Sequence, residues 1–122
     1  MALPLVLVVD DFSDAREMFS EYLGAVGFRT AEARDGQEAV AQAHALGPDV
    51  ILMDLSLPGM DGWEATRNLK ADPKTRDIPV VALTGHSPEE FSAGARAAGC
   101  DGFVTKPCVP DELVAELRRH LC

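Results

Sequence analysis

Short apolar runs alternate with longer segments of helical period along this chain. Such an alternation predicts parallel strands joined by helices, because a parallel connection needs a crossover of a dozen or more residues. The crossovers are right-handed, so helices are expected on both faces of the sheet. The sequence therefore predicts an α/β fold, a doubly wound five-stranded parallel sheet in three layers. The predicted strands are Leu5 to Val9, Phe28 to Ala33, Val50 to Met53, Val80 to Leu83 and Gly102 to Thr105.

Length and composition favour one compact domain over residues 1–122. A chain of 122 residues with 47% hydrophobic residues can bury most of its apolar surface without disulfides or structural metals. Its three cysteines follow no close-paired metal-binding spacing, and the amino terminus does not resemble a secretory segment. The apolar stretch over residues 3–9 is too short to cross a bilayer. We therefore expect a cytoplasmic protein without a membrane partner.

The charge of the chain argues against one class of partner. The formal net charge is −9 at pH 7, which repels the phosphate backbone of DNA and RNA. Direct nucleic acid binding by this chain is therefore not expected.

Four of the five predicted strands end in groups that phosphoryl transfer requires. Asp10 and Asp11 follow the first strand, and Asp54 follows the third. Thr84 follows the fourth strand and Lys106 the fifth. The carboxyl ends of parallel strands share one edge of a sheet, where α/β proteins bind their ligands. Three acids, one hydroxyl and one ammonium are therefore expected to converge.

A polar residue after a strand is most simply a helix cap, and this alternative has to be weighed. Ser13 is expected to cap the first helix, and residues 61–64 and 87–90 read as capping boxes for later helices. Asp10, Asp11, Asp54 and Thr84 are then not needed as helix caps. Asp35, after the second strand, is the exception: we interpret it as a cap without chemistry.

Gathered carboxylates repel one another, and a divalent cation would resolve this repulsion. The oxygen ligands of Asp10, Asp11 and Asp54 suit Mg²⁺, and the sequence offers no Cys/His cluster for zinc. Asp54 would be the nucleophile that forms an acyl phosphate, with Lys106 and the Thr84 hydroxyl holding the phosphoryl oxygens. The sequence predicts a phosphoryl-transfer site.

These motifs resemble the response-regulator receiver domains of two-component signalling, the CheY-like family. The resemblance covers nearly the whole chain. It implies a flavodoxin-like (βα)5 fold with strand order 2-1-3-4-5, and phosphorylation of Asp54 by a histidine kinase or phosphotransfer protein. The residues that carry it, in family order and spacing, are Asp10-Asp11, Asp54 within Met-Asp-Leu-Ser-Leu-Pro-Gly-Met-Asp-Gly, Thr84-Gly85 and Lys106-Pro107.

The resemblance also implies a metal site in detail. Mg²⁺ would be held by Asp11, Asp54 and the backbone carbonyl of Ser56, with Asp10 acting partly through water. A cis peptide is implied between Lys106 and Pro107.

A conformational switch is implied as well, in which Thr84 moves toward the phosphoryl group and Phe103 rotates inward. For Phe103 a plain core role is an equal alternative, because the tyrosine hydroxyl common in the family is absent. Ser56 and His86 lie where they could tune the lifetime of the acyl phosphate. The fourth helix, fifth strand and fifth helix would form the output face for an unknown partner or domain, and phosphorylation-dependent homodimerisation is a further hypothesis.

Two alternatives to a signalling phosphoacceptor that assists its own phosphorylation and dephosphorylation stay open. One is a Mg²⁺-dependent aspartyl-phosphate phosphatase or phosphotransferase acting on small substrates. It is disfavoured because Ser56 stands where a second catalytic acid would follow Asp54. The other is a receiver-like binding module that is not phosphorylated. The sequence also leaves open whether the chain is a freestanding regulator, a phosphorelay shuttle or part of a longer protein.

Overall fold

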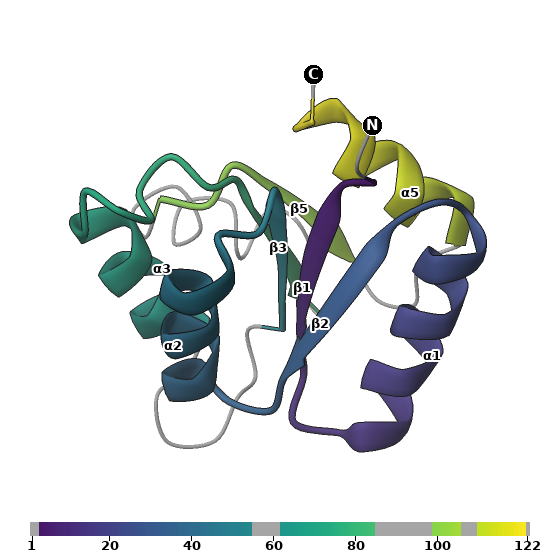
Figure 1. Cartoon of the computed structure of the whole chain (residues 1–122), viewed down its shortest axis with the longest axis horizontal. Helices are drawn as coiled ribbons and strands as arrows, with labels where there is room; N and C mark the ends of the chain where they lie inside the picture. The colour runs from purple at the N-terminus through teal and green to yellow at the C-terminus, as the bar shows by residue number, and fades with distance from the viewer. Residues whose placement is uncertain (1–2, 55–61, 85–98, 106–109, 122) are drawn as a thin grey trace.

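The part of the chain that the structure describes forms three layers, with a parallel sheet between two pairs of helices (Figure 1). The computed structural model describes residues 3–54, 62–84, 99–105 and 110–121. The predicted helix between the fourth and fifth strands lies outside these ranges. The described elements are β1 (Leu5–Val9), α1 (Ser13–Ala25), β2 (Arg29–Ala33), α2 (Gly36–Leu46), β3 (Val50–Asp54), α3 (Gly62–Ala71), β4 (Val80–Thr84), β5 (Gly102–Thr105) and α5 (Pro110–Arg119).

The sheet has the predicted topology. Its strands follow the order β2-β1-β3-β4-β5, and every neighbouring pair is parallel. The α/β class, the five-stranded parallel sheet and the strand order are therefore confirmed. β3 lies in the centre, with β1 on one side and β4 on the other.

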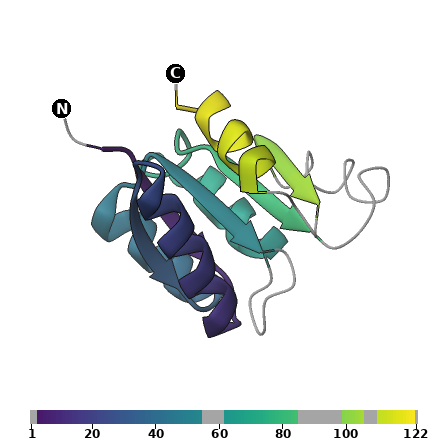
Figure 2. The same ribbon diagram turned by 90° about the vertical axis from the view of Figure 1, so that its right-hand side faces the viewer.

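Each face of the sheet carries its own hydrophobic core, because side chains alternate along a strand with a period of two. In β1, Leu7 and Val9 face the core with α2 and α3, whereas Val6 and Val8 face the core with α1 and α5. The view in Figure 2, turned by 90°, shows the sheet between the two helical layers. All five residues of β3 are buried, as expected for a strand covered on both faces.

The ends of the helices follow local chemistry. Asp35 caps α2 as predicted, since its carboxylate accepts a hydrogen bond of 2.8 Å from the amide of Glu38. Gly47 ends α2 in the left-handed conformation at φ 56°, which glycine adopts without strain.

Two sequence predictions at helix ends were wrong. Ser13 is the first residue of α1 and not its cap; Phe12 occupies the cap position, without a side-chain cap. Phe28 does not start β2, because its amide donates to the Leu23 carbonyl at 3.0 Å and so belongs to the turn that closes α1.

The amino edge of the sheet is tied together by Lys70 of α3. Its ammonium donates to the carbonyl oxygens of Ile78 at 2.8 Å and Arg76 at 3.1 Å, and to Asp101 Oδ2 at 2.8 Å. The same carboxylate oxygen accepts the amide of Val80 at 2.8 Å. This cluster, which we call the Lys70 clamp, joins α3 to the starts of β4 and β5, because Asp101 directly precedes β5.

None of the described helices is both long enough and apolar enough to cross a membrane.

Candidate phosphoryl-transfer site

The site lies at the carboxyl edge of the sheet. β1 and β3 are in register with Val9 opposite Met53, which brings the following residues, Asp10 and Asp54, side by side. β3 and β4 pair Asp54 with Leu83, directly before Thr84. Thr84 is opposite Thr105, the last residue of β5. The strand ends that carry the predicted groups therefore share one edge.

Asp10, Asp11 and Asp54 form a cluster, which we call the acid cluster. One carboxylate oxygen from each lies within 4.8 Å of those of the other two. Asp10 and Asp54 are each 3% exposed, whereas Asp11 is exposed. Two buried carboxylates at such short range are costly unless positive charge compensates them.

The acid cluster fits a hard divalent cation. Its ligand atoms are carboxylate oxygens, which Mg²⁺ prefers. Because these three oxygens lie within 4.8 Å of one another, they could hold one cation between them. The exposure of Asp11 leaves one side open to water molecules, of which Mg²⁺ usually keeps several.

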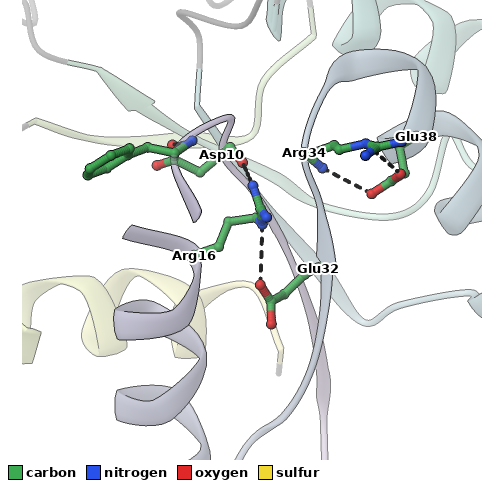
Figure 3. A network of polar contacts seen from close by, with 6 residues as sticks. Asp10, Arg16, Glu32, Arg34 and Glu38 are labelled. Carbon is green, nitrogen blue, oxygen red and sulfur yellow. Dashed lines mark hydrogen bonds and ion pairs between the residues drawn. The ribbon is translucent and has the colours of Figure 1, made fainter. Parts of the chain in front are cut away.

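The backbone and side chain of Asp10 are held by several hydrogen bonds. Its amide donates to the Ala33 carbonyl of β2 at 3.1 Å, and its Oδ1 accepts the Phe12 amide at 3.0 Å. Its carbonyl oxygen accepts Nη1 of Arg16 at 2.8 Å (Figure 3). The turn between β1 and α1 is thereby fixed beside the acid cluster.

Arg16 is a residue that the sequence analysis missed. Its Nε also contacts Glu32 Oε1 of β2 at 3.3 Å, and its side chain is 17% exposed. One signal in the sequence could have identified it: Arg16 lies in the first turns of α1, where the helix dipole disfavours a cation. This signal is small, because a charge at a helix end changes stability by only about 0.3 to 1 kcal/mol.

The remaining predicted site residues are described in part or not at all. The backbone of Thr84 ends β4, and Phe103 lies in β5 opposite Ala82. Their predicted switch roles stay predictions. Ser56, His86, Lys106 and Pro107, together with the predicted cis peptide, lie outside the described residues.

Comparison with known proteins identifies the family. The sequence profile of the response regulator receiver domain matches residues 6–118. The phosphate regulon transcriptional regulatory protein PhoB of Escherichia coli is 42% identical over 113 residues, which are 93% of this chain and 49% of PhoB. The DNA-binding response regulator MtrA of Mycolicibacterium smegmatis is 40% identical over 116 residues, 95% of this chain and 50% of MtrA.

Solved structures agree with this assignment. The chemotaxis protein CheY4 of Vibrio cholerae superposes with a TM-score of 0.93 at 33% identity, over 98% of this chain and all of that one. The receiver domain of a Pseudomonas aeruginosa sensor histidine kinase gives a TM-score of 0.90 at 32% identity, over 98% of both chains. That structure has a magnesium ion coordinated in its active site cleft.

The chain spans about half the length of the curated relatives it matches, and 98% or more of the two solved chains named above. The profile match covers most of the chain, and the fold agrees with the family throughout the described residues. The chain belongs to the response regulator receiver domains, the phosphoacceptor modules of two-component signalling.

Proposed function

We propose that Asp54 is the phosphoacceptor of this receiver domain. The observation that supports the proposal best is the acid cluster, in which Asp54 ends the central strand within 4.8 Å of two further carboxylates. The Asp54 carboxylate attacks phosphorus, and the bond from phosphorus to the donor's leaving atom breaks as the new oxygen–phosphorus bond forms. A histidine kinase or phosphotransfer protein is the proposed physiological donor.

Asp10, Asp11 and Asp54, with the carbonyl of Ser56, would hold the Mg²⁺ ion. When bound, the cation neutralises charge on the phosphoryl oxygens. Asp10 and Asp11 contribute by presenting oxygen ligands from one rigid turn, and Asp54 by presenting its second oxygen to the donor. Lys106 and the hydroxyl of Thr84 are proposed to hold the remaining phosphoryl oxygens.

Residues at the edge of the sheet are proposed to convert phosphorylation into a signal. Thr84 would move toward the phosphoryl group and Phe103 would rotate inward, favouring one of two conformations by differential contacts. The output partner would bind at the face formed by β5, α5 and the segment between β4 and β5. Ser56 and His86 are proposed to set the lifetime of the acyl phosphate.

The chain is proposed to act as one receiver domain and a signalling phosphoacceptor without turnover of small substrates. A cytoplasmic location and phosphorylation-dependent homodimerisation are part of this proposal. DNA-directed output, as the names of PhoB and MtrA indicate for those proteins, would need a separate segment, because this chain carries a net charge of −9.

Intact mass spectrometry tests the proposal. Wild type and Asp54→Asn are incubated with Mg²⁺ and acetyl phosphate, with and without a chelator. We expect one added phosphoryl group on wild type with Mg²⁺, and none on the variant or after chelation. Continuous consumption of acetyl phosphate far beyond one equivalent, without an adduct, would favour a phosphatase. No adduct even with a cognate kinase would favour a module that is not phosphorylated.

A further inference from the structure

Arg16 lies between the acid cluster and β2. Its guanidinium makes two contacts at once: Nη1 donates to the carbonyl oxygen of Asp10 at 2.8 Å, and Nε contacts Glu32 Oε1 at 3.3 Å. Figure 3 shows the side chain reaching from α1 to both groups. We infer that Arg16 is a positioning residue for the cation site, which fixes the peptide between Asp10 and Asp11 so that both carboxylates face Asp54. This inference rests on the proposed Mg²⁺ site.

The hydrogen bond from Arg16 binds the peptide group that determines how the Asp10 and Asp11 carboxylates are oriented. The carbonyl of Asp10 belongs to the peptide unit that links Asp10 to Asp11, and rotation of that unit would turn the two side chains relative to each other. The amide of Asp10 is already bonded to Ala33, and its carboxylate to the Phe12 amide. The bond from Arg16 therefore fixes the remaining polar group of the Asp10 backbone.

We infer that Arg16 acts through the position of its hydrogen bonds and not through its positive charge. A positive charge near a cation site would by itself repel the cation. Glu32 compensates that charge, because its carboxylate lies 3.3 Å from Nε of Arg16. Arg16 meets the carbonyl and the carboxylate with two different nitrogens, Nη1 and Nε, which the guanidinium holds in one plane. A lysine would have to meet both groups from one nitrogen at the end of a differently shaped side chain, so we expect it not to reproduce this geometry.

The chain offers a matched control in Arg34. It lies at the same edge of the sheet, directly after β2, and pairs with Glu38 at 3.4 Å. Figure 3 shows this pair apart from Asp10. Replacing either arginine by glutamine removes the same charge from an ion pair, but Arg16→Gln alone removes a bond to Asp10.

The experiment is a Mg²⁺ titration followed by two-dimensional NMR of backbone amides. It compares wild type, Arg16→Gln, Arg16→Lys, Arg34→Gln and Asp11→Asn. Loss of a partner that orients a metal ligand commonly weakens metal binding by 10- to 100-fold, so we expect about a 10-fold higher Kd for Arg16→Gln and for Arg16→Lys. Arg34→Gln should bind as wild type does. The spectra without Mg²⁺ show whether each variant is folded, and if Arg16→Gln is not, Arg16→Lys decides.

Two results would overturn the inference. In the first, Arg16→Gln binds Mg²⁺ within twofold of Arg34→Gln, which would limit Arg16 to a role in stability. In the second, Arg16→Lys binds as wild type while Arg16→Gln does not, which would assign the effect to charge. Failure of the proposed function is distinguishable, because wild type would then show no saturable Mg²⁺ binding, or would bind no better than Asp11→Asn.

Discussion

Replacing a single carboxylate at the edge of the sheet tests the proposed Mg²⁺ site directly. Mg²⁺ that binds the folded state stabilises it by RT ln(1 + [Mg²⁺]/Kd), which is about 1.4 kcal/mol at ten times the Kd. We expect this stabilisation in wild type and its near-complete loss in Asp11→Asn, since one ligand of the acid cluster is removed. The measurement is thermal unfolding with and without Mg²⁺.

Asp14 provides the control for this variant, because it is also exposed and lies three residues further along, in the first turn of α1. Asp14→Asn should keep the full effect of Mg²⁺. Equal stabilisation of Asp11→Asn and wild type would contradict the assignment of Asp11 as a ligand.

Cys100 permits a prediction on pH. Burial of its thiol raises its pKa above the ordinary value, and the negative charge of Asp101 adds to this, while a hydrogen bond with Thr66 and the positive charge of Lys70 act in the opposite direction. The neutral thiol is thus favoured by folding. Its contribution to stability is fully present below the pKa of the unfolded state and is lost as the pH rises through the raised pKa.

The pH dependence of alkylation by iodoacetamide measures this pKa in a Cys108→Ser, Cys122→Ser background. The folded protein should react with a midpoint at higher pH than the same chain unfolded in urea. A midpoint equal to or below that of the unfolded chain would show that the thiol is not shielded as described.

At the residue scale, sequence reasoning could place groups whose position follows from the ends of the strands. It proposed Asp10, Asp11 and Asp54 as one cluster, and the structure brings their carboxylates together. It missed Arg16, because the contact with Asp10 depends on how α1 packs beside β1. It also predicted Ser13 as the cap of α1, which is wrong, since helix boundaries shift by a residue without changing the pattern of apolar positions.

At the scale of single elements, α2 allows a test of how much one helix cap contributes to stability. Asp35 accepts the amide of Glu38 at 2.8 Å, and Glu38 Oε1 accepts the amide of Arg34 at 3.1 Å. Asp35→Ala should lower the free energy of unfolding by about 1 kcal/mol, whereas Asp35→Asn keeps an acceptor and should cost much less. Urea denaturation followed by circular dichroism distinguishes the two, and equal losses would argue against capping.

The Lys70 clamp holds two strands and one helix through a single ammonium. Asp101→Ala removes the acceptor shared by Lys70 and the Val80 amide, and bonds to charged groups contribute about 1.5 to 3 kcal/mol. Because Asp101 is 38% exposed, we expect the lower end, about 1.5 kcal/mol, in chemical denaturation. Asp77→Ala is the control: Asp77 is exposed and forms no ion pair with the part of the chain that the structure describes. If Asp77→Ala lowered the free energy of unfolding as much as Asp101→Ala, the effect could not be assigned to the Lys70 clamp.

The strands themselves were predicted closely because each is short and bounded by turn residues, and β1, β3 and β4 are also apolar runs. Gly102–Thr105 matches the prediction, and β3 and β4 each extend one residue further, to Asp54 and Thr84. The clamp could not be predicted in this way. Its partners are separated by up to 31 residues, and nothing in the local pattern around Lys70 indicates which carboxylate it meets.

For the whole molecule, the two cores share one sheet and are expected to unfold together. Ile51 faces the core with α2 and α3, and Leu52 the core with α1 and α5, although they are adjacent in β3. Ile51→Ala and Leu52→Ala should each lower the free energy of unfolding by about 3 kcal/mol. Each should shift one cooperative transition, observed by both calorimetry and circular dichroism.

Two separated transitions in either variant would contradict a single domain. The one-domain prediction followed from length and hydrophobic content, and it stays a prediction that this measurement tests. The strand order, in contrast, came from the family resemblance, because composition and periodicity do not specify which strands are neighbours.

The central place of β3 has a consequence for how a modified Asp54 would behave. β3 pairs with β1 up to Met53 and with β4 up to Asp54, and all five of its residues are buried, so a shift of Asp54 would disturb this pairing and the packing around it. A phosphoryl group there would be attached to a strand that has a paired neighbour on each side. The attachment point would stay still, and the surrounding segments would have to travel toward it.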